Sequence, residues 1–213
     1  MTDEPLGRAR ARMVAEQIEA RGIADPALLE AMRTVPRERF VPREMRGYAF
    51  RDGPLPIEAG QTISQPSIVA EMIAAAGIES GDRVLEVGAG SGYAAAVMGQ
   101  LAAEVYGIER HEILADLAAQ RMRDLDYDNV TIRHGDGTKG WAEKAPFDAI
   151  LVAAQGAAVP EALSEQLAQG GRIVIPIGGR SMQALKKYTK RSDGSLAEED
   201  LGHVRFVPLV EGD

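Results

Sequence analysis

The residues best placed for ligand chemistry form a glycine-rich run, Glu-Val-Gly-Ala-Gly-Ser-Gly, over residues 86–92. The run follows a short apolar segment, 83–87, and opens a segment of helical character from about Gly92 to Leu101. Glycines let the backbone approach a ligand without a Cβ clash, and a helix N-terminus offers unpaired N–H groups. Ligands bind at such strand-to-helix turns in open parallel sheets. We therefore expect a nucleotide-like cofactor to bind at Glu86, Gly88, Gly90 and Gly92.

The spacing of these glycines narrows the choice of cofactor. A dinucleotide fingerprint has the form G-x-G-x-x-G, whereas the third glycine here comes one position early, at Gly92. No Gly-Lys-Ser/Thr follows, so the run is not a P-loop. The form G-x-G-x-G, preceded by the acidic Glu86, is typical of S-adenosylmethionine-dependent methyltransferases. S-adenosylmethionine is therefore the predicted cofactor, and the spacing disfavours an NAD-dependent oxidoreductase.

Acidic residues follow the next two apolar segments. Glu109 comes directly after the segment 105–108, where a carboxylate can accept hydrogen bonds from both ribose hydroxyls. An acid at this position serves NAD and S-adenosylmethionine alike, so it does not discriminate between them. Asp136, in Gly135-Asp-Gly137, could accept from an adenine amino group or could simply form a turn. We interpret the neighbouring His134 as structural and Trp141 as a half-buried packing residue.

A second informative segment is Gly-Gln-Thr-Ile-Ser-Gln-Pro over residues 60–66. Chemistry alone favours a helix cap here, in which a Ser or Gln side chain binds the free N–H groups of a helix beginning at Pro66. Ser64 lacks the context of a nucleophile elbow, and no histidine is an evident partner, which argues against a serine hydrolase.

The pattern around these motifs predicts an α/β fold. Helices are expected over 8–21, from Pro26 and from Pro66, with an ordered loop over 36–60 that is rich in proline, glycine and apolar residues. Strands and helices then alternate, which predicts a Rossmann-like, doubly wound, mostly parallel sheet. The expected strands are 83–87, 105–108, 130–132, 147–153 and 172–177, with a helix before the last one ending at Gly170-Gly171.

The C-terminal part departs from this alternation. Segments 184–189 and 204–210 flank a turn at Asp193-Gly194 and predict an antiparallel edge of the sheet. We expect one methyltransferase domain over 1–213. Residues 1–80 would form an N-terminal helical and loop cap on the substrate side, and residues 81–213 the cofactor-binding core with its C-terminal strands.

Composition restricts the partners. The 213 residues include 24 Lys and Arg against 32 Asp and Glu, a net charge of −8, which argues against nucleic-acid binding. Cysteine is absent, so there is no disulfide, thiol nucleophile or cysteine metal site, and the three histidines are far apart; we predict no metal. No apolar run suggests a signal peptide or a membrane span, so we expect a cytoplasmic location and no membrane partner.

Nearly the whole chain resembles the protein-L-isoaspartate O-methyltransferase family of the bacterial and archaeal type. The Gln-Thr-Ile-Ser-Gln-Pro run over 61–66 is highly specific, whereas the glycine loop indicates only a methyltransferase. The other matching segments are 13–18, Val35-Pro-Arg leading to Phe40-Val-Pro, 52–57, 84–93, 135–137 and 206–210.

The resemblance implies repair of aged proteins. A methyl group passes from S-adenosylmethionine to the free α-carboxyl of L-isoaspartyl residues, and the ester collapses to a succinimide. Isoaspartyl peptides and proteins are then the partners, and no oligomer is required. The resemblance also implies that Ser64 is the active-site serine and that Val210 lies near the substrate carboxylate. It further implies that six residues border the cofactor: Gln61, Thr62, Ile63, Glu109, Asp136 and Gly137.

One segment departs from the family pattern. After the fourth core strand the family has an alanine-rich turn with proline near the substrate, and here residues 153–160 read Ala-Ala-Gln-Gly-Ala-Ala-Val-Pro. Two alternatives to the repair function stay open. One is a methyltransferase for a small-molecule carboxyl or hydroxyl. The other is a non-catalytic module that binds S-adenosylmethionine.

Overall fold

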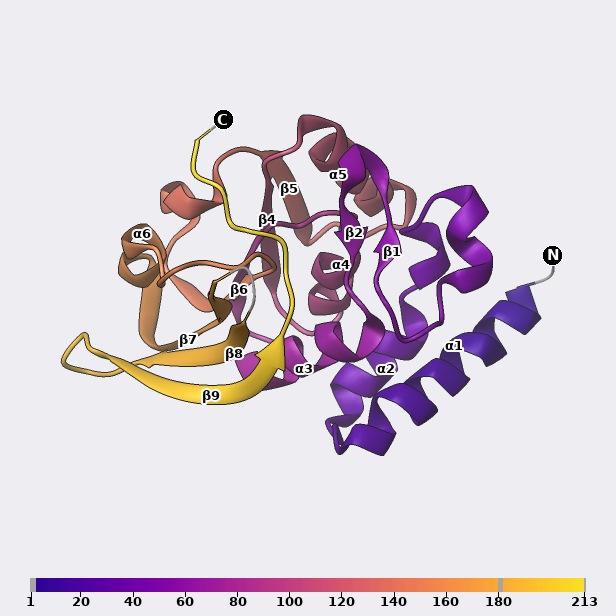
Figure 1. The fold of residues 1–213 in the computed structure, drawn as a ribbon, viewed down its shortest axis with the longest axis horizontal. Helices are drawn as coiled ribbons and strands as arrows, with labels where there is room; N and C mark the ends of the chain where they lie inside the picture. The colour runs from indigo at the N-terminus through magenta and orange to yellow at the C-terminus, as the bar shows by residue number, and fades with distance from the viewer. Residues whose placement is uncertain (1–2, 180–181, 213) are drawn as a thin grey trace.

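A computed structural model describes residues 3–179 and 182–212, and a seven-stranded sheet forms the centre of this described part (Figure 1). The strand order is β5-β4-β3-β6-β7-β8-β9. β3 to β7 run parallel, and β8 and β9 are antiparallel to their neighbours. These strands are β3 (Arg83–Val87), β4 (Glu104–Glu109), β5 (Val130–His134), β6 (Phe147–Val152), β7 (Leu167–Gly178), β8 (Gln183–Lys190) and β9 (Leu196–Val204).

β3 is the point at which the strand order reverses. From β3 the chain adds β4 and β5 on one side, and then returns to add β6 and β7 on the other. Because the two connections leave in opposite directions, a crevice opens at the carboxyl ends of these strands. The glycine-rich run lies directly after β3, so the fold puts it at this crevice.

Side chains of the central strands alternate between two faces. Val84, Val105 and Leu151 pack in one apolar cluster, which also contains buried residues of α1 to α5. Leu85, Ile108 and Ile150 pack in a second cluster on the other face with Trp141 and with Leu163 of α6. The helices are α1 (Asp3–Gln17), α2 (Pro26–Thr34), α3 (Pro66–Ala76), α4 (Tyr93–Gly99), α5 (Glu112–Asp124) and α6 (Glu161–Glu165). Among the described residues, no helix combines the length and apolarity that crossing a bilayer requires.

The helices and the ordered loop predicted for the N-terminal segment are present, but the first helix spans Asp3–Gln17 rather than 8–21 and is followed by a 3₁₀ turn, Glu19–Arg21. Gly22 ends the first helical stretch in a left-handed conformation, and the Asp25 carboxylate accepts the Ala27 N–H at 2.9 Å to begin α2. The loop between α2 and α3 is ordered and lies against the body of the protein, since Phe40 and Val41 are buried. Within it are short 3₁₀ turns and the two-stranded ribbon of β1 (Leu55–Pro56) and β2 (Thr62–Ile63).

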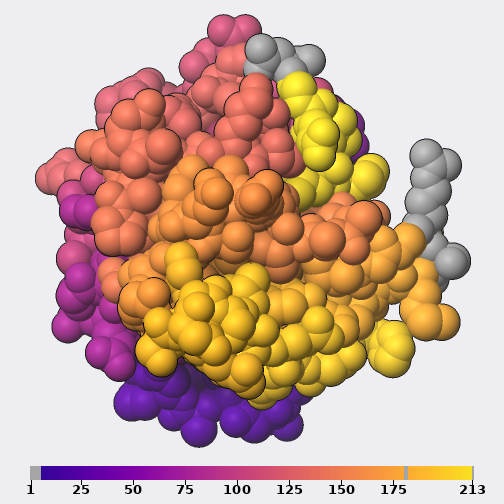
Figure 2. Space-filling model, turned by 90° about the vertical axis from the view of Figure 1, so that its left-hand side faces the viewer, coloured from indigo at the N-terminus to yellow at the C-terminus, as the bar shows by residue number. Residues whose placement is uncertain are grey.

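Two predicted boundaries near the C-terminus are wrong. The helix before β7 ends at Glu165 rather than Gly170, because Leu167 already pairs with Phe147 of β6. The last strand is β9, over 196–204 rather than 204–210; it pairs with β8 and forms the edge surface in Figure 2. The apolar spacing over 206–210 belongs instead to an extended tail, which forms a single parallel bridge between Pro208 and Gln155.

Candidate active site

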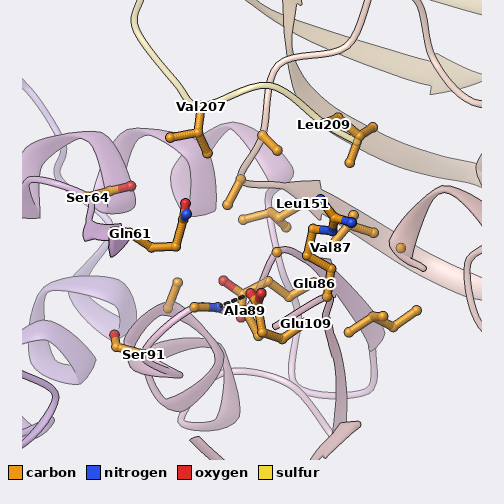
Figure 3. A pocket seen from close by; sticks show the side chains of 18 of the residues that line it. Gln61, Ser64, Glu86, Val87, Ala89, Ser91, Glu109, Leu151, Val207 and Leu209 are labelled. Atoms are coloured by element: carbon orange, nitrogen blue, oxygen red, sulfur yellow. Dashed lines mark hydrogen bonds between the residues drawn. The ribbon is translucent and has the colours of Figure 1, made fainter. Parts of the chain in front are cut away.

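A cavity of about 360 Å³ lies at the carboxyl ends of β3, β4 and β6. Three parts of the chain supply much of its lining (Figure 3). We call Glu86–Ser91 together with Glu109 the strand-end wall, and Gln61–Ser64 the N-terminal wall. The third part is residues 207–210 of the extended C-terminal segment, which we call the tail. In Figure 3, Gln61 and Ser64 lie on one side of the cavity, the Glu86 and Glu109 carboxylates are close together below it, and Val207 and Leu209 lie above.

The strand-end wall has the backbone that its glycines predict. Gly88 and Gly90 have φ values of +83° and +53°, which only glycine adopts readily. Three backbone N–H groups of this loop, which the sequence predicts to be free for a ligand, are instead bonded within the protein. Those of Gly88 and Ala89 donate to the Ile108 carbonyl at 2.8 and 3.1 Å, and that of Gly90 donates to Glu109 at 2.8 Å. The loop therefore offers a ligand close backbone approach, and these three N–H groups are already used.

Two carboxylates of this wall differ in their bonding. Glu109 is buried, and its oxygens accept the N–H groups of Gly90 and His111 at 2.8 and 2.9 Å. Glu86 is also buried, but its Oε2 atom has no partner. Burial, reinforced by the negative charge of Glu109, raises the pKa of Glu86 well above its usual range. An orphaned acceptor beside a second acid suits a ligand that carries positive charge and hydrogen-bond donors.

The N-terminal wall overturns the capping interpretation of residues 60–66. α3 begins at Pro66 without a side-chain bond at its N-cap, Gln65. Gln65 instead donates to Ser67 Oγ at 2.9 Å, and the Ser67 N–H and hydroxyl both donate to Asp52. Ser64 lines the cavity, and within the described residues its hydroxyl has no hydrogen-bond partner. Its hydroxyl is thus available to a ligand.

The Arg121 side chain and the Gln155 backbone, both from distant segments, hold the sides of the cavity in place. Arg121 of α5 donates to the Ser91 carbonyl at 3.0 Å and lies 3.6 Å from Glu58, which precedes the N-terminal wall. Gln155 holds the tail: its N–H donates to Val207 and its carbonyl accepts from Leu209, both at 2.8 Å. Gln155 lies in the segment that departs from the family pattern, so this departure sits beside the cavity mouth.

Most of the predicted site residues meet at this cavity. Gly92 and Asp136 do not line it. A Cβ atom on Gly92 would meet Met122 and Ala118 of α5 at 3.0 and 3.1 Å, so this glycine permits helix packing. The Asp136 carboxylate accepts from Thr138 and from the Gly212 N–H, at 2.6 and 3.0 Å. The predicted site residues that do line the cavity are Gln61, Thr62, Ile63, Ser64, Glu86, Gly88, Gly90, Glu109, Gly137 and Val210.

Other lining residues carried no clear signal in the sequence. Arg110 and His111 follow Glu109 directly, so the strand-end rule could have included them. Tyr93 follows the glycine run and is fully buried. The sequence predicts a strand over Val207 to Leu209, and of this tail it predicts only Val210 at the site, whereas all four residues of 207–210 line the cavity. His134 stays outside, where its ring bonds to the Arg110 carbonyl at 3.0 Å. Trp141 is more buried than expected, at 8% exposure.

Fold and site together define a class of protein. The sheet is parallel with an antiparallel edge, a glycine loop lies at the point where the strand order reverses, and an acid ends the next strand. These features together are typical of S-adenosylmethionine-dependent methyltransferases. The residues also fit this cofactor, because the unpartnered Glu86 oxygen and the oriented Glu109 carboxylate face the same cavity.

Comparisons with known proteins identify the family. The model of the family "Protein-L-isoaspartate(D-aspartate) O-methyltransferase (PCMT)" matches residues 8–213. A protein-L-isoaspartate O-methyltransferase of Methylorubrum populi is 57% identical over 204 residues, covering 96% of each chain. One from Rhodopseudomonas palustris, strain HaA2, is 55% identical, covering 94% of this chain and 82% of the relative.

Solved structures agree with this family. One protein-L-isoaspartate O-methyltransferase has a TM-score of 0.84 at 30% identity, covering 93% of this chain and 65% of its own. Another, from Plasmodium falciparum in complex with S-adenosyl-L-homocysteine, has a TM-score of 0.82 at 27% identity, covering 95% and 99%. The chain belongs to the protein-L-isoaspartate O-methyltransferase family. It is an enzyme that uses S-adenosylmethionine to methylate L-isoaspartyl residues of damaged proteins.

Proposed function

We propose that Ser64 aligns the free α-carboxyl of an L-isoaspartyl residue for methyl transfer. Residues 1–80 form the cap on the substrate side, of which residues 61–63 also border the cofactor, and residues 81–213 form the cofactor-binding core with its C-terminal strands. One observation carries this assignment. The unbonded Ser64 hydroxyl and the strand-end wall line the same cavity from different sides. Val210, on the tail, completes the substrate side of the mouth in this proposal.

The cofactor side rests on the strand-end wall. Glu109 would hold the ribose, because each of its oxygens keeps a lone pair beyond the backbone N–H that it already accepts. The unpartnered oxygen of Glu86 would accept from the cationic end of the cofactor, and Gly88, Gly90 and Gly137 allow close backbone approach. Gln61, Thr62 and Ile63 would close the cofactor compartment opposite. For Gly92 and Asp136 we propose indirect roles, in helix packing and in holding Gly212.

The chemistry asks little of the side chains. When bound, S-adenosylmethionine supplies a methyl group on a positively charged sulfur. The acceptor is a carboxylate, whose pKa of about 4 leaves it ionised at neutral pH without a general base. The protein then needs to orient the carboxylate and to exclude water, which weakens nucleophiles by solvating them. Ser64 can donate its O–H to one carboxylate oxygen and leave the other free to react.

A Ser64→Ala variant tests this role. The substrate pair is two peptides that are identical except that one carries isoaspartate and the other aspartate. We expect base-labile label from S-adenosylmethionine on the isoaspartyl peptide alone, with kcat lowered about 10- to 100-fold in the variant, because one orienting hydrogen bond is lost. Cofactor affinity should stay within about twofold.

The matched control is Ser80→Ala, at an exposed serine outside the cavity. Unchanged turnover in the Ser64→Ala variant would remove Ser64 from the mechanism. Equal label on both peptides would contradict the substrate class. The cytoplasmic location stays a prediction, which cell fractionation can test.

A further inference from the structure

Arg37 is a buried cation beside the N-terminal wall. It lies in the Val35-Pro-Arg segment after α2 and is 0% exposed. Its Nε donates to the Ala49 carbonyl at 2.8 Å, and its Nη2 donates to the Ser64 carbonyl at 2.7 Å. One guanidinium therefore joins Ala49, which follows the 3₁₀ turn Arg43–Tyr48, to Ser64, the residue that we assign to the substrate carboxyl.

The guanidinium also touches the cofactor side. Its central carbon lies 4.6 Å from the centroid of the Tyr93 ring, and Tyr93 follows the glycine run and lines the cavity. This stacking fixes the plane of the guanidinium group, whose forked set of N–H donors we call the fork, because the ring face attracts a cation. Arg37 thus contacts Ser64 of the N-terminal wall and Tyr93, a second residue that lines the cavity.

The charge of Arg37 is left without a direct counter-ion. Among the described residues it forms no ion pair, and its Nη1 atom is buried without a hydrogen-bond partner. Asp52 favours the charged form of Arg37 electrostatically, but its carboxylate already pairs with Arg21 and accepts from Ser67. Burial lowers the pKa of Arg37, yet an arginine remains protonated at neutral pH.

A buried, unpaired cation is costly, and neutral amide donors could bridge two carbonyls without that cost. The cost is offset if an anion arrives nearby during the reaction. The substrate of this enzyme brings a carboxylate, and Ser64 is bonded directly to the Arg37 fork.

We propose that Arg37 is a positioning residue with two actions: its fork fixes the Ser64 backbone, and its charge attracts the isoaspartyl carboxylate. This inference rests on the role proposed for Ser64. It adds that substrate affinity and turnover depend on a residue that lies outside the cavity lining.

Two substitutions separate the two actions. Arg37→Met removes both charge and fork, and should raise the KM for the isoaspartyl peptide about tenfold or more and lower kcat. The Kd of the cationic S-adenosylmethionine should stay equal or fall slightly, because a like charge has been removed. Arg37→Lys keeps the charge without the fork, so it should restore most of the KM while kcat stays several-fold low.

The sign of the cofactor effect distinguishes positioning from general structural damage. Arg39→Met, at an exposed arginine of the same turn, is the matched control. Weaker binding of both cofactor and peptide in the Arg37→Met variant, or unchanged KM and kcat, would overturn the proposal. If the Arg37→Met variant does not fold, the Arg37→Lys variant tests the proposal. A KM that rises in Arg37→Lys by the same factor by which kcat falls would overturn the proposal.

Ser64→Ala, measured in parallel, keeps the two proposals apart. Normal turnover there removes the Ser64 role and with it the fork action of Arg37. A low kcat there, together with wild-type kinetics in the Arg37→Met variant, removes only the Arg37 proposal.

Discussion

The strand-end wall and the N-terminal wall face each other across one cavity, yet different kinds of contact hold them. Gly88, Ala89 and Gly90 are fixed by backbone N–H bonds to the end of β4, the neighbouring strand. Ser64 and the start of α3 are fixed by side chains, those of Arg37 and Asp52. The first wall is thus set mainly by the pairing of β3 with β4. In the second wall, pairing with β1 holds Thr62 and Ile63, whereas Ser64 and the start of α3 depend on individual side chains.

This difference predicts where substitutions act. A change in the strand-end wall should alter cofactor binding first, because its side chains face the cofactor compartment. A change among the supports of the N-terminal wall should alter turnover and peptide binding while cofactor affinity survives. Four further predictions probe this separation.

The largest effect is expected from Glu109→Gln. The substitution removes the charge and sets an amide N–H₂ against a backbone N–H of Gly90 or His111. Loss of charged hydrogen bonds costs about 1.5–3 kcal/mol each, so the Kd of S-adenosylmethionine should rise roughly 100-fold. Titration calorimetry measures it, with Glu112→Gln at an exposed position as the control. A Kd within threefold of the wild type would contradict the ribose assignment.

Glu86→Gln should act through pH. Because the pKa of Glu86 is raised in the folded state, the folded protein holds a proton that the unfolded chain has released. Wild-type stability from this group is therefore present below about pH 4.3 and is lost as the pH rises towards the raised pKa. Above that window the ligand-free Glu86→Gln variant should be more stable, by about 1.4 kcal/mol for each unit of the pKa shift.

Urea unfolding at several pH values measures this difference, which should vanish near pH 4. The same substitution should weaken cofactor binding, since the ionised carboxylate is the form that attracts a cation. A variant that is less stable than the wild type at pH 8 would show that Glu86 supports the fold rather than the ligand.

Asp52→Asn should separate the two walls more finely. Asp52 accepts from the Ser67 hydroxyl at 2.7 Å and pairs with Arg21, so the change should cost about 1 kcal/mol of stability. We expect kcat to fall a few-fold, because α3 begins just after Ser64, while the Kd of S-adenosylmethionine is kept. The exposed Asp116→Asn serves as the control. A selective loss of cofactor affinity would break the separation between the walls.

The smallest effect is expected from Gln155→Met. The Gln155 side chain donates to the Gly178 carbonyl at 2.5 Å, which steadies the loop that holds the tail. Loss of one such bond should raise the KM of the peptide about three- to fivefold. Hydrogen exchange should increase at the backbone N–H groups of Gln155 and Leu209, which donate to the Val207 and Gln155 carbonyls. Gln169→Met, at an exposed glutamine of β7, should change neither.

Local chemistry made much of the fold predictable. The glycine run after β3, the Asp25-Pro26 helix start and the turn at Asp193-Gly194 each depend on residues adjacent in sequence. Short apolar segments bounded by glycine, proline or polar turn residues predicted the core strands, because a strand that is buried on both faces consists almost entirely of apolar residues. The strand-end wall follows from these elements, so Glu86 and Glu109 could be placed at the cavity in advance.

Pairing partners decided what the sequence left open. The apolar spacing over 206–210 is equally suited to a strand and to a cavity lining, and only the pairing of β8 with 196–204 excluded the strand.

The Gln61–Pro66 run likewise suited a helix cap. Its role changed because Asp52 supplies the cap from 15 residues away, which leaves Ser64 free. By itself, then, the sequence determined the elements and the glycine loop, because short-range sterics and burial fix them. Tertiary structure decided the N-terminal wall, because a hydrogen bond between residues such as Arg37 and Ser64, 27 positions apart, depends on the path of the folded chain.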